Sequence, residues 1–308
     1  MADMNMSLAK MMEQFGDESK CRAYLEALRW PEGVACLRCR GTKVYRLPKR
    51  DQFLCASCEY QFSVTVDTIF HDTHLPLASW FLGAILLCEA KKGMSACQVQ
   101  RSLGIKTYKT AWYLCHRIRA AMVETDKPKL GGQIEMDETY VGGKGHGFAV
   151  RGRGTKKRPV IGIRQRNGEL RLFHAKEVTG RVLEKFLKEN VGENVDLFVT
   201  DEFGAYKGVA RRAGLRDKHK VVQHSTKEYV RGEAHTNSIE SAFSLFKRGL
   251  RSSWHKLSAK HLQAYLEEMC FRFNNRKNPY LFRDTILKLI ASPNLEYKKL
   301  TAKVMNAA

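Results

Sequence analysis

Two matched cysteine pairs constrain the fold of this 308-residue chain more than any other feature of its sequence. Cys36 and Cys39 enclose two residues in "CLRC", and Cys55 and Cys58 repeat that spacing in "CASC". Fifteen residues separate the pairs, which lies within the spacing of a four-cysteine zinc site. Short strand-like segments with basic turns lie between and after the pairs. We therefore expect a zinc ribbon with a structural Zn²⁺ over residues 31–70.

The residues on either side of the ribbon carry helix signals. Residues 1–30 are expected to form an N-terminal helical segment, and "LASWFLGAILLCEAKK" (77–92) indicates an apolar helix. Ser95 and Gln98 have the spacing of a capping box, the helix they open ends near Gly104, and Thr107 can cap a second helix. Residues 75–124 thus predict a helix-turn-helix, although helical hairpins of this shape also occur as plain core. The candidates for DNA contact on its second helix are Tyr108, Lys109, His116, Arg117 and Arg119.

The charge of the chain favours a polyanionic partner. It has 53 Lys and Arg against 32 Asp and Glu, a net charge of +21. Such a surface attracts DNA or RNA, although a merely solvated, repulsive surface is the alternative. No secretory signal opens the sequence, and the apolar run at 80–88 is too short to span a bilayer. We expect a cytoplasmic, nucleoid-associated protein, in which paired cysteines bind metal rather than form disulfides.

Acidic residues in strand contexts mark a second domain over residues 130–280. "QIEMDETYVGG" predicts a strand that holds Asp137, residues 159–178 predict a hairpin, and 180–191 predict an amphipathic helix. A later strand ends near Asp201, and a helix then holds Glu240. This order of elements indicates an α/β fold of the RNase H-like (integrase) type, followed by a C-terminal tail at 281–308. A buried aspartate in an apolar strand costs several kcal/mol unless it is paired or holds a metal.

The helix at "SIESAFSLFKRGL" has an apolar stripe and a polar stripe. At roughly 100° per residue, Asn237, Glu240 and Lys247 gather on the polar side. Taken alone, this segment is an ordinary amphipathic helix with a solvated face. Together with Asp137 and Asp201, Glu240 would complete a carboxylate cluster that binds two Mg²⁺ or Mn²⁺ ions and acts on a phosphodiester. Lys247 and the adjacent Arg248 would contact DNA phosphates.

These motifs together resemble a known family. "CLRC…CASC", "EMDETYVGGK", "VTDEFGAY" and "HTNSIESAFSLFKRGLR" are similar to bacterial insertion-sequence DDE transposases, in the ISXO-like group with an N-terminal transposase zinc ribbon. The similarity extends over about residues 15–280 and implies Asp137 as first acid and Asp201 as second. The Asn237/Glu240 helix is then the third element, followed by Lys247. Members of this group use either asparagine or glutamate there. We prefer Glu240 because a carboxylate bridges divalent cations better, with Asn237 as an alternative or auxiliary residue.

Several neighbouring residues are assigned lesser roles. Strand alternation points Glu138 to the face opposite Asp137, so it is not chosen as a ligand. Glu135 shares the face of Asp137 and is expected to be a supporting or surface acid, and His235 to be a satisfied polar residue rather than part of the metal site. The basic loop 144–158 is expected either to grip phosphates or to be solvated.

The predicted function is DNA transposition. The resemblance implies an enzyme that binds terminal inverted repeats, cleaves the element ends and joins their 3′-hydroxyls to target DNA, as a homo-oligomer on double-stranded DNA. Carboxylate-and-metal chemistry needs no covalent protein–DNA intermediate. The alternatives are a catalytically inactive DNA-binding regulator and a structure-specific nuclease on the same fold.

Overall fold

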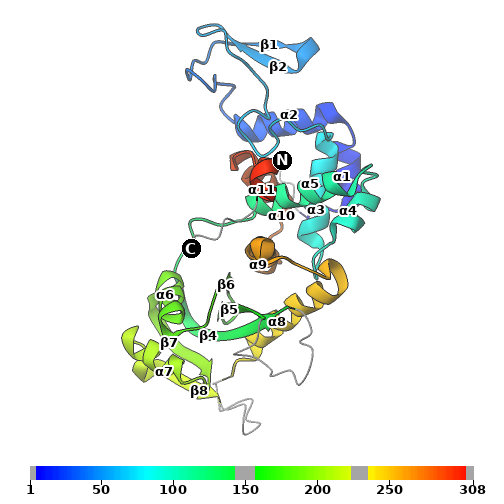
Figure 1. Cartoon of the computed structure of the whole chain (residues 1–308). Helices are drawn as coiled ribbons and strands as arrows, with labels where there is room; N and C mark the ends of the chain where they lie inside the picture. The colour runs from blue at the N-terminus through cyan, green and yellow to red at the C-terminus, as the bar shows by residue number, and fades with distance from the viewer. Residues whose placement is uncertain (1–4, 143–156, 223–234, 303–308) are drawn as a thin grey trace. The chain divides into compact units, whose positions relative to one another are not determined.

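The computed structural model describes residues 5–142, 157–222 and 235–302, which divide into two compact units (Figure 1). Unit 1 comprises Met1–Met122 together with Asn278–Ala308, and unit 2 comprises Val123–Lys277. In the described ranges, no helix has both the length and the apolar character needed to cross a membrane.

Helices from both ends of the chain build the core of unit 1. They are α1 (Leu8–Phe15), α2 (Glu18–Arg29), α3 (Leu77–Glu89), α10 (Leu281–Ala291) and the short α11 (Tyr297–Thr301). The Asp17 carboxylate caps α2 by accepting the Ser19 N–H at 2.7 Å. Phe15 of α1, Phe81 of α3 and Phe282 of α10 pack edge-on or tilted against one another, with ring centroids 5.3–5.7 Å apart. The segment expected to be a tail therefore supplies a helix to this core.

The ribbon of unit 1 is a small antiparallel sheet in the order β1-β2-β3. Its strands are β1 (Val44–Leu47), β2 (Gln52–Cys55) and β3 (Gln61–Phe62), with a short 3-10 turn at Pro48–Arg50. Phe53 of β2 and Phe62 of β3 are buried beside the cysteines, and Trp30 packs edge-on against both rings. Aromatic packing thus gives this small sheet a core of its own.

Two further helices of unit 1 are joined by a short turn, as the capping signals predicted. The Ser95 hydroxyl accepts the Gln98 N–H at 3.1 Å at the start of α4 (Ala96–Ser102). The Thr107 hydroxyl accepts the Thr110 N–H at 3.2 Å at the start of α5 (Tyr108–Ala121). The chain reverses at Gly104, whose φ of +63° is readily accessible to glycine.

Unit 2 contains a five-stranded sheet in the order β6-β5-β4-β7-β8. The strands are β4 (Leu130–Val141), β5 (Arg158–Gln165), β6 (Leu170–His174), β7 (Val191–Asp201) and β8 (His219–Val222). β4, β5 and β6 form an antiparallel meander, whereas β7 and β8 run parallel to β4. This mixed sheet, with its antiparallel half first and its parallel half second, is the predicted RNase H-like arrangement.

Helices cover both faces of this sheet. α6 (Gly180–Asn190) and α7 (Ala205–Arg212) pack on the face that includes Met136 and Ile161. α8 (Asn237–Gly249) and α9 (Ala259–Asn274) pack on the opposite face. A π-helical turn at Leu250–Trp254 follows α8, and a 3-10 turn at Arg216–Lys218 precedes β8. The acids predicted on β4, β7 and α8 thus come from the sheet and from the helix layer on one face.

Candidate active site and metal centres

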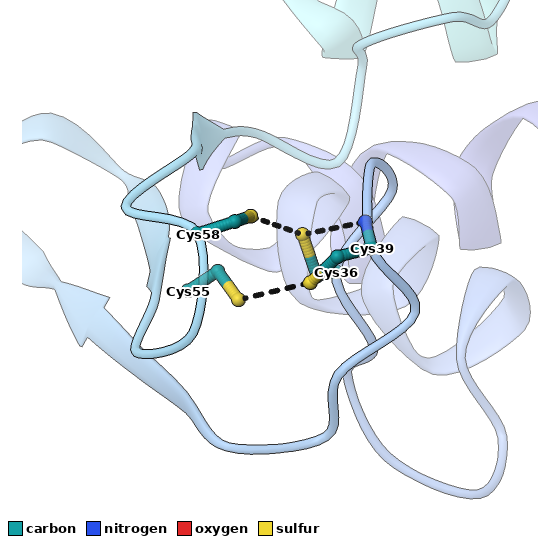
Figure 2. Close-up of side chains that lie close together, drawn as sticks. All are labelled: Cys36, Cys39, Cys55 and Cys58. Atoms are coloured by element: carbon teal, nitrogen blue, oxygen red, sulfur yellow. Dashed lines mark hydrogen bonds between the residues drawn. The ribbon is translucent and has the colours of Figure 1, made fainter.

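The four ribbon cysteines converge on one point (Figure 2). The Sγ atoms of Cys36 and Cys58 lie 3.6 Å apart, and those of Cys39 and Cys55 lie 3.5 Å apart. A tetrahedral zinc with Zn–S bonds of about 2.3 Å holds its sulfurs about 3.8 Å apart, so the donor set fits Zn²⁺.

The backbone around these cysteines also suits thiolates. The Cys36 sulfur accepts the Arg38 and Cys39 N–H groups at 3.4 and 3.5 Å. Although burial acts to raise the pKa of Cys36, these N–H groups and the neighbouring thiols lower it to about 6. The turn at Cys36–Cys39 therefore stabilises a deprotonated sulfur at Cys36, which is the form that ligates a metal.

Asp137 and Asp201 are brought together by the pairing of β4 with β7. Glu135 pairs with Val199 in parallel register, and the two aspartates lie two residues further along their strands, on the same face. Asp137 Oδ1 accepts the Glu138 N–H at 2.7 Å, and Asp201 Oδ1 accepts the Phe203 N–H at 3.0 Å. Pairing of two parallel strands therefore places acids 64 positions apart in the sequence side by side.

Glu138 belongs to the same cluster, which corrects its exclusion in the sequence analysis. Carboxylate oxygens of Asp137, Glu138 and Asp201 all lie within 4.8 Å of one another. Alternation along β4 did give the face correctly, because Glu138 accepts a 2.7 Å hydrogen bond from Tyr206 of α7 on the opposite side. However, β7 ends at Asp201 and leaves the edge of β4 open there, so carboxylates from both faces can meet.

The electrostatics of Asp137 favour a cation at this cluster. Burial raises the pKa of Asp137 well above its ordinary value, and the charges of Glu138, Asp201 and Glu240 raise it further. Carboxylates crowded in this way repel one another. The donors are all hard oxygen atoms, which suits Mg²⁺ or Mn²⁺ and not a thiolate-preferring metal.

α8 brings Glu240 and Lys247 within electrostatic range of Asp137. Glu240 is half-buried, and its Oε1 accepts the Thr236 hydroxyl at 2.8 Å. Burial lowers the pKa of Lys247, whereas the charge of Asp137 opposes this shift. Asn237, the first residue of α8, is exposed, as is Arg248.

A buried acid links β4 to the start of α8. Glu135 is fully buried, and its carboxylate accepts the Ile239 N–H at 2.9 Å and the Arg166 Nε–H at 2.7 Å. Arg166 also donates to the backbone carbonyl of His235 at 2.9 Å, and the His235 Nδ1 lies 3.4 Å from Glu135. Glu135 is thus no surface acid. It joins the strand that carries Asp137 to the helix that carries Glu240.

Gly162 allows α8 to lie directly on the sheet. It pairs with Asp137 across β4 and β5, so any side chain there would project on the face of Asp137. A Cβ atom at this position would lie 2.8 Å from the side chains of Ile239 and Phe243. Such distances are shorter than real carbon contacts, so a larger residue here would force these side chains or α8 to move.

The DNA-contact prediction for α5 is corrected at three positions. His116, Arg117 and Arg119 are buried, at 2%, 4% and 1% exposure. The Arg117 guanidinium donates to the His71 carbonyl at 2.8 Å and lies over the Trp80 ring. These side chains are polar in type but face neighbouring elements, because α5 is covered along most of its length.

The first turn of α5 is open to solvent. Tyr108 is 50% exposed, and Lys109 is exposed with its ammonium 4.4 Å from the ring centre of Tyr297. These two residues therefore remain available for contact with a partner. The basic loop predicted at 144–158 lies almost entirely outside the described residues.

Comparison with known proteins adds independent findings. Residues 129–274 match the family described as the ISXO2-like transposase domain, and residues 16–61 match the transposase zinc-ribbon domain. A protein of Halobacterium salinarum, described as an uncharacterized protein in transposable element ISH50, is 30% identical over 281 residues, which is 85% of this chain and 92% of the relative. Among solved structures, the crystal structure of the Mos1 strand transfer complex matches with 13% identity and a TM-score of 0.29, over 68% of this chain and 75% of that one.

Proposed function

Because this chain belongs to the ISXO2-like family of insertion-sequence transposases, we propose that it is a DDE transposase that cleaves the ends of its element and joins them to target DNA. The observation that carries this proposal is the meeting of Asp137 and Asp201 on adjacent parallel strands, with the charge of Glu240 acting on Asp137. Three acids from separate parts of the chain are then available around the interior strands β4 and β7.

The chemistry consists of two displacements at phosphorus. In the first, a water oxygen bonds to the phosphorus at the element end, the bond to the 3′-oxygen breaks, and that oxygen leaves as a 3′-hydroxyl. In the second, this hydroxyl bonds to a target phosphorus and displaces the target's own 3′-oxygen. Divalent cations, when bound, activate the attacking oxygen and stabilise the leaving one. No side chain becomes attached to DNA.

We assign roles to the site residues as follows. Asp137 and Asp201 hold the cations, and Glu240 is the third ligand because its charge reaches Asp137 whereas Asn237 is exposed at the start of α8. Glu138 competes for that role, since its oxygens lie within the 4.8 Å cluster. Its hydrogen bond from Tyr206 favours an accessory function.

We assign Lys247 to the DNA phosphate at the reacting end. It is half-buried and close enough to Asp137 for the carboxylate charge to act on it. A cation beside the acids offsets charge that develops on the phosphate oxygens. Arg248 next to it is exposed and would contact the flanking backbone.

The N-terminal modules are proposed to recognise the terminal inverted repeats. The cysteine pairs and the α4–α5 hairpin belong to unit 1, whereas the acidic cluster belongs to unit 2. Tyr108 and Lys109 are exposed on the first turn of α5. The N-terminal residues of a recognition helix are those that reach base edges in a major groove. Two ends must be held together for joining, so we expect a homo-oligomer on DNA.

A strand-transfer assay tests the function. The full chain is incubated with labelled duplexes carrying the element ends, plasmid target and Mg²⁺ or Mn²⁺. The proposal expects joined products, which Asp137→Asn and Asp201→Asn abolish while leaving DNA binding in place. Cleavage without joining would support the nuclease, and binding alone would support the regulator.

The third ligand is resolved by three matched variants in the same assay. We expect Glu240→Gln to abolish joining, and Asn237→Ala and Glu138→Gln to reduce it less. Loss of joining in Glu138→Gln with activity retained in Glu240→Gln would transfer the role to Glu138.

A further inference from the structure

Unit 2 has a cationic cleft between α7 and the start of β8. This α7–β8 cleft has a volume of about 510 Å³ and is lined by Lys207, Gly208, Ala210, Arg211, Arg216 and His219. β8 is an edge strand of the sheet, so the cleft opens at the sheet margin. None of the roles assigned above uses it.

The charge around the α7–β8 cleft is far more one-sided than that of the whole chain. Residues 205–220 contain six Lys or Arg and a single acid, Asp217, whereas the chain has 53 bases and 32 acids. Lys207, Arg211 and Arg216 are exposed, and no acid among the described residues forms an ion pair with them. Nearby, Arg212 does have such a partner in Glu184. Unneutralised cations along a concave surface attract a polyanion more strongly than scattered surface charges do.

The elements that form the α7–β8 cleft also connect it to the acidic cluster. Lys207 directly follows Tyr206, whose hydroxyl donates to Glu138 at 2.7 Å. On the other side of the cleft, His219 of β8 lies opposite Phe198 of β7, three residues before Asp201, whose own partner Val222 is at the far end of β8. A strand of DNA entering or leaving the acidic cluster over α7 would meet these cations next.

We propose that the α7–β8 cleft binds the phosphodiester backbone of duplex DNA, contacting phosphates through Lys207, Arg211 and Arg216. This inference rests on the proposed function, because it extends the path of the same DNA away from the acids. Backbone contacts position DNA without reading its sequence, so the cleft would act on target and element DNA alike.

The test is a salt titration of DNA binding by the full chain. A labelled duplex without element ends is bound at salt concentrations from about 50 to 200 mM, and the affinity is read by fluorescence anisotropy. The cleft triple variant is Lys207→Ala/Arg211→Ala/Arg216→Ala. The control triple variant removes the same charge from α6 on the same face of the sheet, through Arg181→Ala/Lys185→Ala/Lys188→Ala.

We expect the cleft variant to flatten the plot of log affinity against log salt by up to about 2.7, because each lost phosphate contact contributes about 0.9. The control variant should leave the slope nearly unchanged. An equal decrease of the slope in both variants would show that only net charge matters and would overturn the proposal. An unchanged slope in the cleft variant would also overturn it. Thermal unfolding verifies that both triple variants fold. If the cleft triple variant does not fold, the single variant Lys207→Ala replaces it, and its slope should decrease by about 0.9.

The strand-transfer assay separates this proposal from the function itself. If the wild type joins ends while the cleft and control variants bind DNA with the same slope, the cleft is wrong and the function stands. If the wild type binds DNA but never joins ends, the proposed function fails and the slopes alone decide on the cleft.

Discussion

Replacing Gly162 by alanine should reveal how closely α8 must approach the sheet. The added Cβ would lie 2.8 Å from the Ile239 Cδ1 and Phe243 Cζ atoms and 3.0 Å from the Leu172 Cδ2 atom. Comfortable carbon contacts are about 3.5–4.0 Å, so α8 or its side chains must move by roughly 0.5–1 Å. The affected helix carries Glu240 one residue after Ile239, so the movement reaches the proposed metal site.

The expected cost follows from these contacts. Overpacking a core in this way destabilises by about 1–3 kcal/mol. For a domain of about 150 residues, each kcal/mol lowers the melting temperature by about 2–4 °C, which gives a total of roughly 2–12 °C. A displacement of about 1 Å at a catalytic group can reduce the rate about 100-fold, so we expect activity to fall more than stability.

Differential scanning calorimetry and the strand-transfer assay measure the two effects. Gly180→Ala is the matched control, because Gly180 is the first residue of α6 and its Cβ would meet only the Arg212 guanidinium, at an ordinary 3.4 Å. Alanine is the better helix former by about 1 kcal/mol, so the control should not lose stability. A Gly162→Ala protein that melts and joins DNA like the wild type would refute the close packing of α8 on β5.

Three further outcomes are expected. Glu135→Ala should destabilise unit 2 by about 1.5–3 kcal/mol in urea unfolding, because it removes a charged hydrogen bond to the half-buried Arg166 and leaves the Ile239 N–H without its acceptor. Glu135→Gln should cost less, since it still accepts the Ile239 N–H, and equal costs would contradict this. A strong chelator should release about one zinc per chain, measured with a colorimetric indicator, and unfold the ribbon while the circular dichroism of the sheet persists. Burial raises the pKa of Cys270 to about 12, so the unfolded chain loses this proton before the folded chain does as the pH rises. The free energy of unfolding should therefore fall as pH rises from about 9 toward 12. A Cys270→Ala protein whose free energy of unfolding falls with the same pH slope would argue against this.

The order of elements and the ribbon could be predicted because their signals are local. The cysteine spacing needs only its own residues, and the turn at Asn167 between β5 and β6 follows from a residue type that tolerates its φ of +59°. The proximity of Asp137 and Asp201 could also be predicted from the sequence, because the order of the strands implies that the two strands are parallel neighbours in this fold.

The remaining features depend on contacts between distant segments. Side-chain alternation predicts the face of Glu138 but not the end of β7 that lets it join the aspartates. The charge of Arg117 suggested exposure, yet its partners come from residues 71 and 294. The packing of α8 over Gly162 was equally hidden, since a glycine in a strand does not identify the helix that requires it.

The assignment of the chain's last helices to unit 1 has a practical consequence. Unit 2 is attached by both of its ends, so two covalent links, not one, limit how far the two units can separate or twist. Trimming the chain after residue 277 would remove Phe282 from beside Phe15 and Phe81, and the backbone carbonyl of Leu289 from the Ile69 N–H. A shortened protein would therefore lose packing in its N-terminal unit, whereas unit 2 is a continuous stretch of residues 123–277 that keeps all of its own strands and helices.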